Sequence, residues 1–188
     1  MIAPDAAPER FEAHGLRREL ADLNLYRMLL NAPPVAQLEN EINMRIVRGG
    51  VLTQRPQALH LRELAIMRLS WKLGDQYVWS HHLSPMVDTD MPGAEQLGNK
   101  LGVREGADFE GFDAAERCLV AAVDEIVDNG VLAPETVADL RSHLESDAEL
   151  VELVYSMALW RAISSVTMSL QVPLEDNYVS WPPDGRQP

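Results

Sequence analysis

LRELAIMRLSWKLGDQYVWSHHLSP, residues 61–85, is typical of two amphipathic helices joined at a break. In its first half, apolar side chains recur at helical spacing, namely Leu61, Leu64, Ala65, Met67 and Leu69. Glycine is a common helix terminator, and an aspartate directly after it is a favoured N-cap. Gly74 and Asp75 therefore predict the end of a helix over residues 61–73 and the start of another over about 76–82 or slightly beyond.

Groups suited to proton transfer gather on this helix pair. On the second helix, Asp75 and His82 share one face with either Val78 or Trp79, since residues three and four apart are neighbours. A chain that folds back at the glycine brings Glu63 towards the same face. A carboxylate, an imidazole and an aromatic ring that converge in this way indicate a site for acid–base chemistry.

Length, composition and charge limit the other possibilities. The chain has 188 residues, of which 46% are hydrophobic and 24% are charged, as in an ordinary globular protein. We expect a mobile segment at residues 1–15, a single all-α domain at 16–175 and an irregular tail at 176–188. The formal net charge of −13 disfavours binding to nucleic-acid phosphates or to an anionic membrane surface.

Cys118 is the single cysteine, which excludes an internal disulfide and any CxxC redox or zinc motif. Its apolar neighbours in the sequence favour a small core residue over a nucleophile. The N-terminus lacks the basic-then-apolar pattern of a secretion signal. The apolar stretch at 150–170 contains Glu152 and Arg161, which argues against a membrane span. These features together predict a soluble, cytoplasmic protein.

Start and stop signals predict the remaining helices. Asp113, with Glu116 three residues later, has the pattern of a capping box before an apolar run. We predict further helices over about 16–30, 33–49, 94–100, 113–129, 134–144 and 148–171. No segment alternates apolar and polar residues as a strand does, so we predict an all-α fold.

Two motifs within residues 61–85 resemble the carboxymuconolactone decarboxylase family, whose relatives include alkylhydroperoxidase D-like proteins. Residues 62–68 resemble the family helix RELxILR, and residues 74–82 resemble GxxYEWxxH at the same interval. Weaker similarity extends the resemblance over most of residues 20–175. It implies a helical bundle of the alkylhydroperoxidase D-like type that forms oligomers, because relatives are trimers and hexamers.

Peroxidatic relatives carry a CxxC pair in the second motif, and this chain does not. Asp75 and Val78 occupy the two cysteine positions. Because a thiolate is the group that attacks peroxide, thiol peroxidase activity is excluded. Relatives without the cysteines usually have Glu where this chain has Val78, which is a second departure from the family pattern.

The resemblance implies roles for particular residues. His82 would shuttle the proton and Glu63 would tune or share it, although Glu63 could instead pair with a neighbouring cation. Asp75 is either a catalytic group or only an N-cap. The side chains expected to bind substrate are Tyr77, Trp79 and Arg68.

The leading prediction is a decarboxylase- or isomerase-like enzyme that needs no cofactor and acts on a small organic acid, lactone or carbonyl compound. Such reactions require an acid–base pair and a hydrogen-bond donor for the developing enolate oxygen. The alternative is a non-catalytic oligomeric binding or scaffold protein with a decayed site. No metal is expected, since adjacent His81 and His82 cannot both reach one ion from a regular helix. The expected partners are a small-molecule substrate and further copies of the chain.

Overall fold

The computed structural model describes residues 1–87 and 97–188, and for 84–87 and 97 it describes the backbone alone. These described residues form nine α-helices and no β-strand, so the all-α prediction is confirmed. The α-helices are α1 (Ala7–Ala13), α2 (Asn24–Leu29), α3 (Pro33–Ile42), α4 (Pro56–Leu73), α5 (Gln76–Val87), α6 (Leu97–Gly102), α7 (Ala114–Asn129), α8 (Pro134–Ser142) and α9 (Asp147–Ser169). Three short helical segments lie between them, η1 (Arg18–Asp22), η2 (Asn43–Val47) and η3 (Val51–Gln54).

Helix α4 lies at the centre of the main bundle and packs against α5, α7 and α9. It contains the first of the two helices predicted within residues 61–85, and its apolar side chains are buried on several faces. Leu64, Met67 and Leu69 are completely buried in the large hydrophobic cluster. Each fully buried side chain of this size contributes about 1.5–3 kcal/mol, which explains why α4 organises the fold.

Local signals set three helix boundaries as predicted. Gly74 has a left-handed conformation with φ of 74° and ends α4. Asp75 follows and caps α5, since its carboxylate accepts the backbone N–H of Tyr77 at 3.0 Å. At the start of α7, Asp113 and Glu116 form the predicted capping box.

Other boundaries differ from the predictions. The helix predicted over 16–30 is two segments, η1 and α2, because Leu23 between them is extended. The helix predicted over 33–49 changes at Asn43 from α3 to the π-helical η2. Helix α4 begins at Pro56, where proline suits a first helical turn, rather than at 61. Of the helix predicted over 94–100, residues 94–96 lie outside the described residues, and α6 begins at Leu97.

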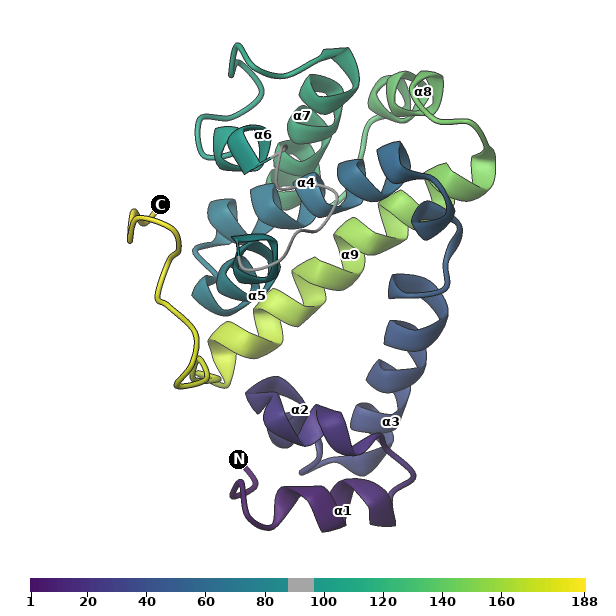
Figure 1. Cartoon of the computed structure of the whole chain (residues 1–188). Helices are drawn as coiled ribbons and strands as arrows, with labels where there is room; N and C mark the ends of the chain where they lie inside the picture. The colour runs from purple at the N-terminus through teal and green to yellow at the C-terminus, as the bar shows by residue number, and fades with distance from the viewer. Residues whose placement is uncertain (88–96) are drawn as a thin grey trace.

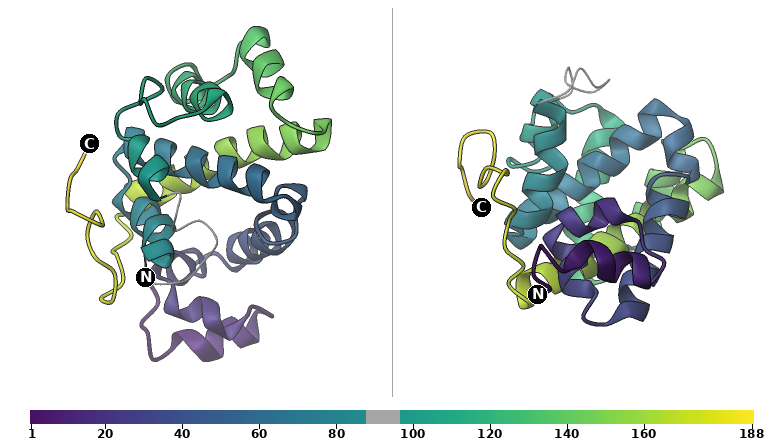
Figure 2. Two further views of the ribbon diagram at one scale, coloured as in Figure 1. Left: turned by 45° about the horizontal axis from the view of Figure 1, so that its top comes forward. Right: turned by 60° about the horizontal axis from the view of Figure 1, so that its bottom comes forward.

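The N-terminal segment, expected to be mobile, contains helix α1. Ile2 and Phe11 are buried in a second hydrophobic cluster that also includes Tyr26 and Leu30. Figure 2 shows α1, α2 and α3 grouped at one end of the bundle. Burial of apolar side chains accounts for this ordered packing, and it compensates for the cost of fixing the backbone.

The C-terminal tail is irregular, as predicted, and is packed against the bundle. Residues 170–188 contain no helix or strand (Figure 1). Trp181 is 5% exposed, and its ring lies 5.8 Å from Trp71 and 6.1 Å from Trp79. Three indole rings therefore attach the tail to α4 and α5.

None of the helices in the described part of the chain combines the length and the apolar character that crossing a membrane requires.

Candidate functional site

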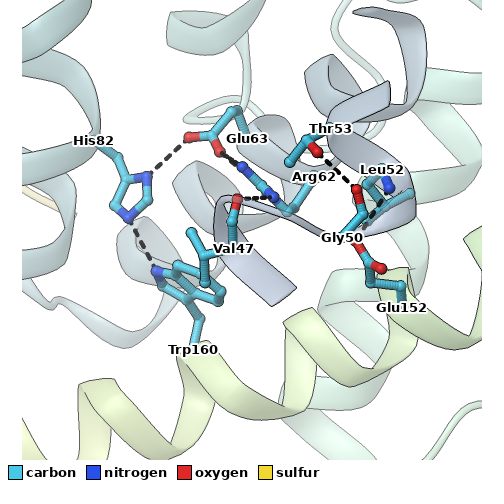
Figure 3. A network of polar contacts seen from close by, with 9 residues as sticks. All are labelled: Val47, Gly50, Leu52, Thr53, Arg62, Glu63, His82, Glu152 and Trp160. Carbon is cyan, nitrogen blue, oxygen red and sulfur yellow. Dashed lines mark hydrogen bonds and ion pairs between the residues drawn. The ribbon is translucent and has the colours of Figure 1, made fainter. Parts of the chain in front are cut away.

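Glu63 and His82 form a hydrogen-bonded pair between α4 and α5. Their contact joins His82 Nδ1 to Glu63 Oε2 over 2.9 Å. The two helices fold back at Gly74, which brings the middle of α4 alongside the middle of α5. Figure 3 shows the carboxylate and the imidazole directed at each other. The sequence-based expectation that these two groups approach each other therefore agrees with the geometry.

Arg62 holds the other oxygen of the Glu63 carboxylate. Its Nε and Nη2 atoms donate to Glu63 Oε1 at 3.2 Å and 3.0 Å. Its Nη1 atom donates to the backbone carbonyl of Val47 at 2.8 Å (Figure 3). Arg62 is only 4% exposed, so its charge is compensated inside the protein. The arginine therefore fixes the carboxylate and ties it to the chain after α3.

The surroundings of Glu63 keep its carboxyl group ionised. Burial raises its pKa, but the neighbouring His82, with its hydrogen bond, and the charges of Arg62 and Lys100 outweigh this effect. The net result is a pKa lowered to about 2. Glu63 is thus a carboxylate at neutral pH and can accept, but not supply, a proton.

Burial lowers the pKa of Lys100 to about 8, against the opposing effect of the Glu63 charge.

Trp160 determines which nitrogen of His82 carries the proton. The indole Nε1 of Trp160 lies 3.0 Å from His82 Nε2. An indole N–H only donates, so Nε2 is the acceptor and Nδ1 carries the proton that is donated to Glu63. The Nε2 lone pair of His82 therefore faces the indole N–H of Trp160. The carboxylate at Nδ1 also stabilises the positive charge that would form if Nε2 took up a proton.

A cavity of about 280 Å³ opens beside this pair, and both His82 and Trp160 line it. Its walls come from α2, α3, η2 and the residues next to them, and from α5 and α9. Its apolar lining residues are Leu23, Leu25, Val47, Val78, Trp160 and Ile163, and its polar lining residues are Tyr26, Glu39, Asn43, Arg48, Tyr77, His81 and His82. A cavity that combines apolar walls with convergent polar groups is typical of a small-molecule site.

The turn that follows η2 is held in place by α9. Glu152 accepts the backbone N–H of Val51 at 2.7 Å. It also accepts the backbone N–H of Leu52 at 3.1 Å (Figure 3). Gly50 has no room for a side chain, because a Cβ there would lie 2.2 Å from Glu152 Oε1 and 2.4 Å from the Ile46 carbonyl oxygen. Val47, at the end of η2 before this turn, lines the cavity, and its carbonyl accepts from Arg62.

Tyr26 and Glu39 are polar residues of the cavity that the sequence-based candidates did not include. Tyr26 is 4% exposed, and among the described residues its hydroxyl has no hydrogen-bond partner. Burial, together with the nearby Glu39, raises the pKa of Tyr26, so its hydroxyl stays protonated. Burial also raises the pKa of Glu39. Nothing in their sequence context marks these residues, since α2 and α3 reach the cavity only through the tertiary fold.

Three of the residues expected in the site make other contacts. Asp75 caps α5 and accepts the hydroxyl of Thr167 at 2.9 Å. Arg68 forms a two-pronged ion pair with Asp124, at 2.6 Å and 2.7 Å. Trp79 is fully buried and donates its indole N–H to the Pro182 carbonyl at 2.8 Å. Among the described residues, none of these three lines the cavity. The cap formed by Asp75 is one of the two roles that the sequence left open.

Tyr77 does line the cavity, but its hydroxyl is already engaged. It donates to Glu175 at 2.8 Å and accepts the backbone N–H of Leu25 at 3.1 Å. His81 Nε2 lies 2.6 Å from the same carboxylate, and the His81 ring stacks on Tyr178 at 4.1 Å. Glu175 therefore connects the tail to α5. Because the Tyr77 hydroxyl already donates to Glu175, Tyr77 forms part of the cavity wall and has no free hydroxyl proton to donate to a substrate.

The described residues contain one set of three potential metal-ligand side chains close together, Cys118, Asp139 and His143, and it lies outside the cavity lining.

Comparison with known protein families found no matching family model, and no curated protein matched the chain.

Proposed function

We propose that the chain is a cofactor-independent enzyme that moves a proton on a small organic acid, lactone or carbonyl compound. Such a reaction is an isomerisation or a decarboxylation. The observation that carries this proposal is the 2.9 Å contact between Glu63 and His82 beside a cavity of about 280 Å³. The resemblance of residues 61–85 to the carboxymuconolactone decarboxylase family supports the same proposal, and membership of that family is part of it.

His82 is the proposed base. Glu63 holds its Nδ1–H, so Nε2 takes the proton from a carbon next to the substrate carbonyl. The electron pair of that C–H bond moves towards the carbonyl oxygen and forms an enolate. The ionised Glu63 stabilises the resulting imidazolium, and His82 then returns the proton to another carbon of the substrate. Trp160 must release Nε2 before the first step, because its indole N–H occupies that lone pair.

Tyr26 is the proposed donor to the developing enolate oxygen. Its hydroxyl is buried, protonated and without a partner among the described residues, so it can donate without breaking an existing hydrogen bond. Arg48, which is exposed and also lines the cavity, would attract an anionic substrate towards the opening.

The test uses the variants His82→Ala and Glu63→Gln with a panel of lactones and oxo acids. We expect kcat on any compound that the wild type converts to fall on the order of a hundredfold or more for His82→Ala, and less for Glu63→Gln. His14→Ala and Glu135→Gln remove the same groups outside the site and should leave kcat unchanged. Unchanged turnover in both site variants would show that Glu63 and His82 take no part in the reaction.

Self-association is a further part of the proposal. Helix α9 exposes Val151, Tyr155 and Met168, and α3 exposes Leu38. Large apolar side chains on the surface of two helices are consistent with an interface between copies of the chain. Light scattering after size exclusion measures this directly, and a monomer at all concentrations would contradict it.

The second candidate function is a non-catalytic binding or scaffold protein, and the contact between Trp160 and His82 favours it. With Glu63 on Nδ1 and Trp160 on Nε2, both nitrogens of the imidazole are satisfied within the protein. In that case the wild type converts no compound of the panel, and the only effect of His82→Ala is a lower melting temperature. A cavity ligand found by thermal shift without turnover would support this alternative.

A further inference from the structure

We propose that Cys118, Asp139 and His143 bind a divalent metal ion of the zinc type where α7 and α8 meet. Cys118 lies on α7, Asp139 on α8 and His143 at the C-terminal cap of α8. One ligand atom from each residue can be chosen so that all three atoms lie within 4.8 Å of one another. None of the three residues lines the cavity, so this site is separate from the proposed acid–base site.

The spacing of the ligand atoms is close to that of a tetrahedral site. Asp139 and His143 are four residues apart, and their Oδ1 and Nε2 atoms are 3.7 Å apart. With metal–ligand bonds of about 2.0–2.3 Å, neighbouring ligand atoms of a tetrahedron lie about 3.3–3.8 Å apart. The aspartate and histidine atoms already have this separation. The cysteine sulfur lies within 4.8 Å of both, so it has to approach them by at most about 1.5 Å.

The three ligand types suit zinc in charge and in softness. A thiolate, a carboxylate and a neutral imidazole together carry two negative charges, which balance a divalent ion. The His143 side chain is 24% exposed and that of Asp139 is 64% exposed, so an ion and a fourth ligand from solvent can reach the site.

Metal binding involves the loss of one proton from the site. Burial, together with Asp139, raises the pKa of the Cys118 thiol to about 12, so the thiol is protonated when no metal is bound. The incoming ion replaces that proton, which passes to solvent while the sulfur keeps the electron pair and coordinates the metal. The oxidation state of neither metal nor sulfur changes. The bound ion then links α8 to α7.

The experiment is a titration of the reduced wild-type chain with cadmium, followed by cadmium–thiolate absorption in the ultraviolet. Because the chain has one cysteine, this absorption reports Cys118 alone. We expect one cadmium ion per chain and a loss of affinity on the order of tenfold or more in His143→Ala and in Asp139→Asn. The matched controls His14→Ala and Asp147→Asn should bind cadmium as the wild type does.

Zinc protection of the Cys118 thiol from alkylation provides a second measurement that needs no variant. One equivalent of zinc should slow alkylation of the folded wild type on the order of tenfold or more. An absence of cadmium–thiolate absorption, cadmium affinity that is unchanged in both ligand variants, or unprotected alkylation would each overturn the proposal. Circular dichroism of the two variants shows whether a loss of binding occurs in a folded chain.

Discussion

Replacement of Glu63 by glutamine should destabilise the protein at neutral pH by about 3 kcal/mol. The pKa of Glu63 is lowered from its ordinary value near 4.5 to about 2, and each unit of difference corresponds to about 1.4 kcal/mol of stability. The Glu63 side chain is only 13% exposed, so solvent screening reduces this figure little. Breaking a buried ion pair costs about 3–5 kcal/mol. Glutamine keeps one oxygen to accept from Arg62 or His82, which places the expected loss at the lower end.

The same reasoning predicts a pH dependence. A carboxyl group whose pKa is depressed by folding contributes stability that is fully present above its unfolded pKa. That contribution disappears as the pH falls through the folded pKa of about 2. The difference in stability between wild type and Glu63→Gln should therefore be constant above about pH 5 and should shrink below about pH 4.

Urea unfolding at several pH values, followed by circular dichroism, measures both predictions. Glu135 is exposed on α8, so Glu135→Gln is the matched control and should change the free energy of unfolding by less than about 0.5 kcal/mol. A loss below about 1 kcal/mol for Glu63→Gln at neutral pH would refute the reasoning. A loss of equal size at neutral pH and at about pH 3 would refute the ionised state of Glu63 in particular.

Two further predictions concern stability. Asp113→Ala removes the side-chain cap of α7 and the acceptor for the Glu116 N–H. It should lower the free energy of unfolding in urea by about 1 kcal/mol. The control Asp108→Ala, at an exposed position, should leave that free energy almost unchanged. Trp181→Ala removes the ring that packs against α4 and α5 and should cost about 3 kcal/mol. It should also speed hydrogen exchange in the tail, and Val179→Ala, which is 64% exposed, is its control. Unchanged exchange in Trp181→Ala would mean that the indole contacts do not hold the tail.

Local sequence was sufficient for the elements that depend on local interactions. Gly74 and Asp75 predicted the break between α4 and α5, because a left-handed glycine and an aspartate cap act within one turn of the chain. Asp113 predicted the start of α7 for the same reason. The division of residues 16–30 at Leu23 was not predicted, since helical spacing of apolar residues continues through it although the backbone of Leu23 is extended.

The candidate site was predictable only in part. Glu63 and His82 are 19 residues apart, and the break at Gly74 was enough to suggest that they meet. Trp160 reaches His82 from 78 residues away, and no local pattern connects the two. Asp75 and Trp79 share the predicted face with His82, but packing directs one to Thr167 and the other to the tail.

The amino-acid sequence by itself determined an all-α chain, the turn that reverses α4 into α5, and the carboxylate and imidazole that this turn brings together. These follow from hydrogen bonds and side-chain spacing within a few residues of each other. Only the tertiary structure decided that Tyr26 and Glu39 face the same cavity as His82, and that α7 and α8 bring Cys118 to His143. Such neighbours come from different helices, and their distances depend on how the apolar faces of those helices pack together, which helical spacing does not encode.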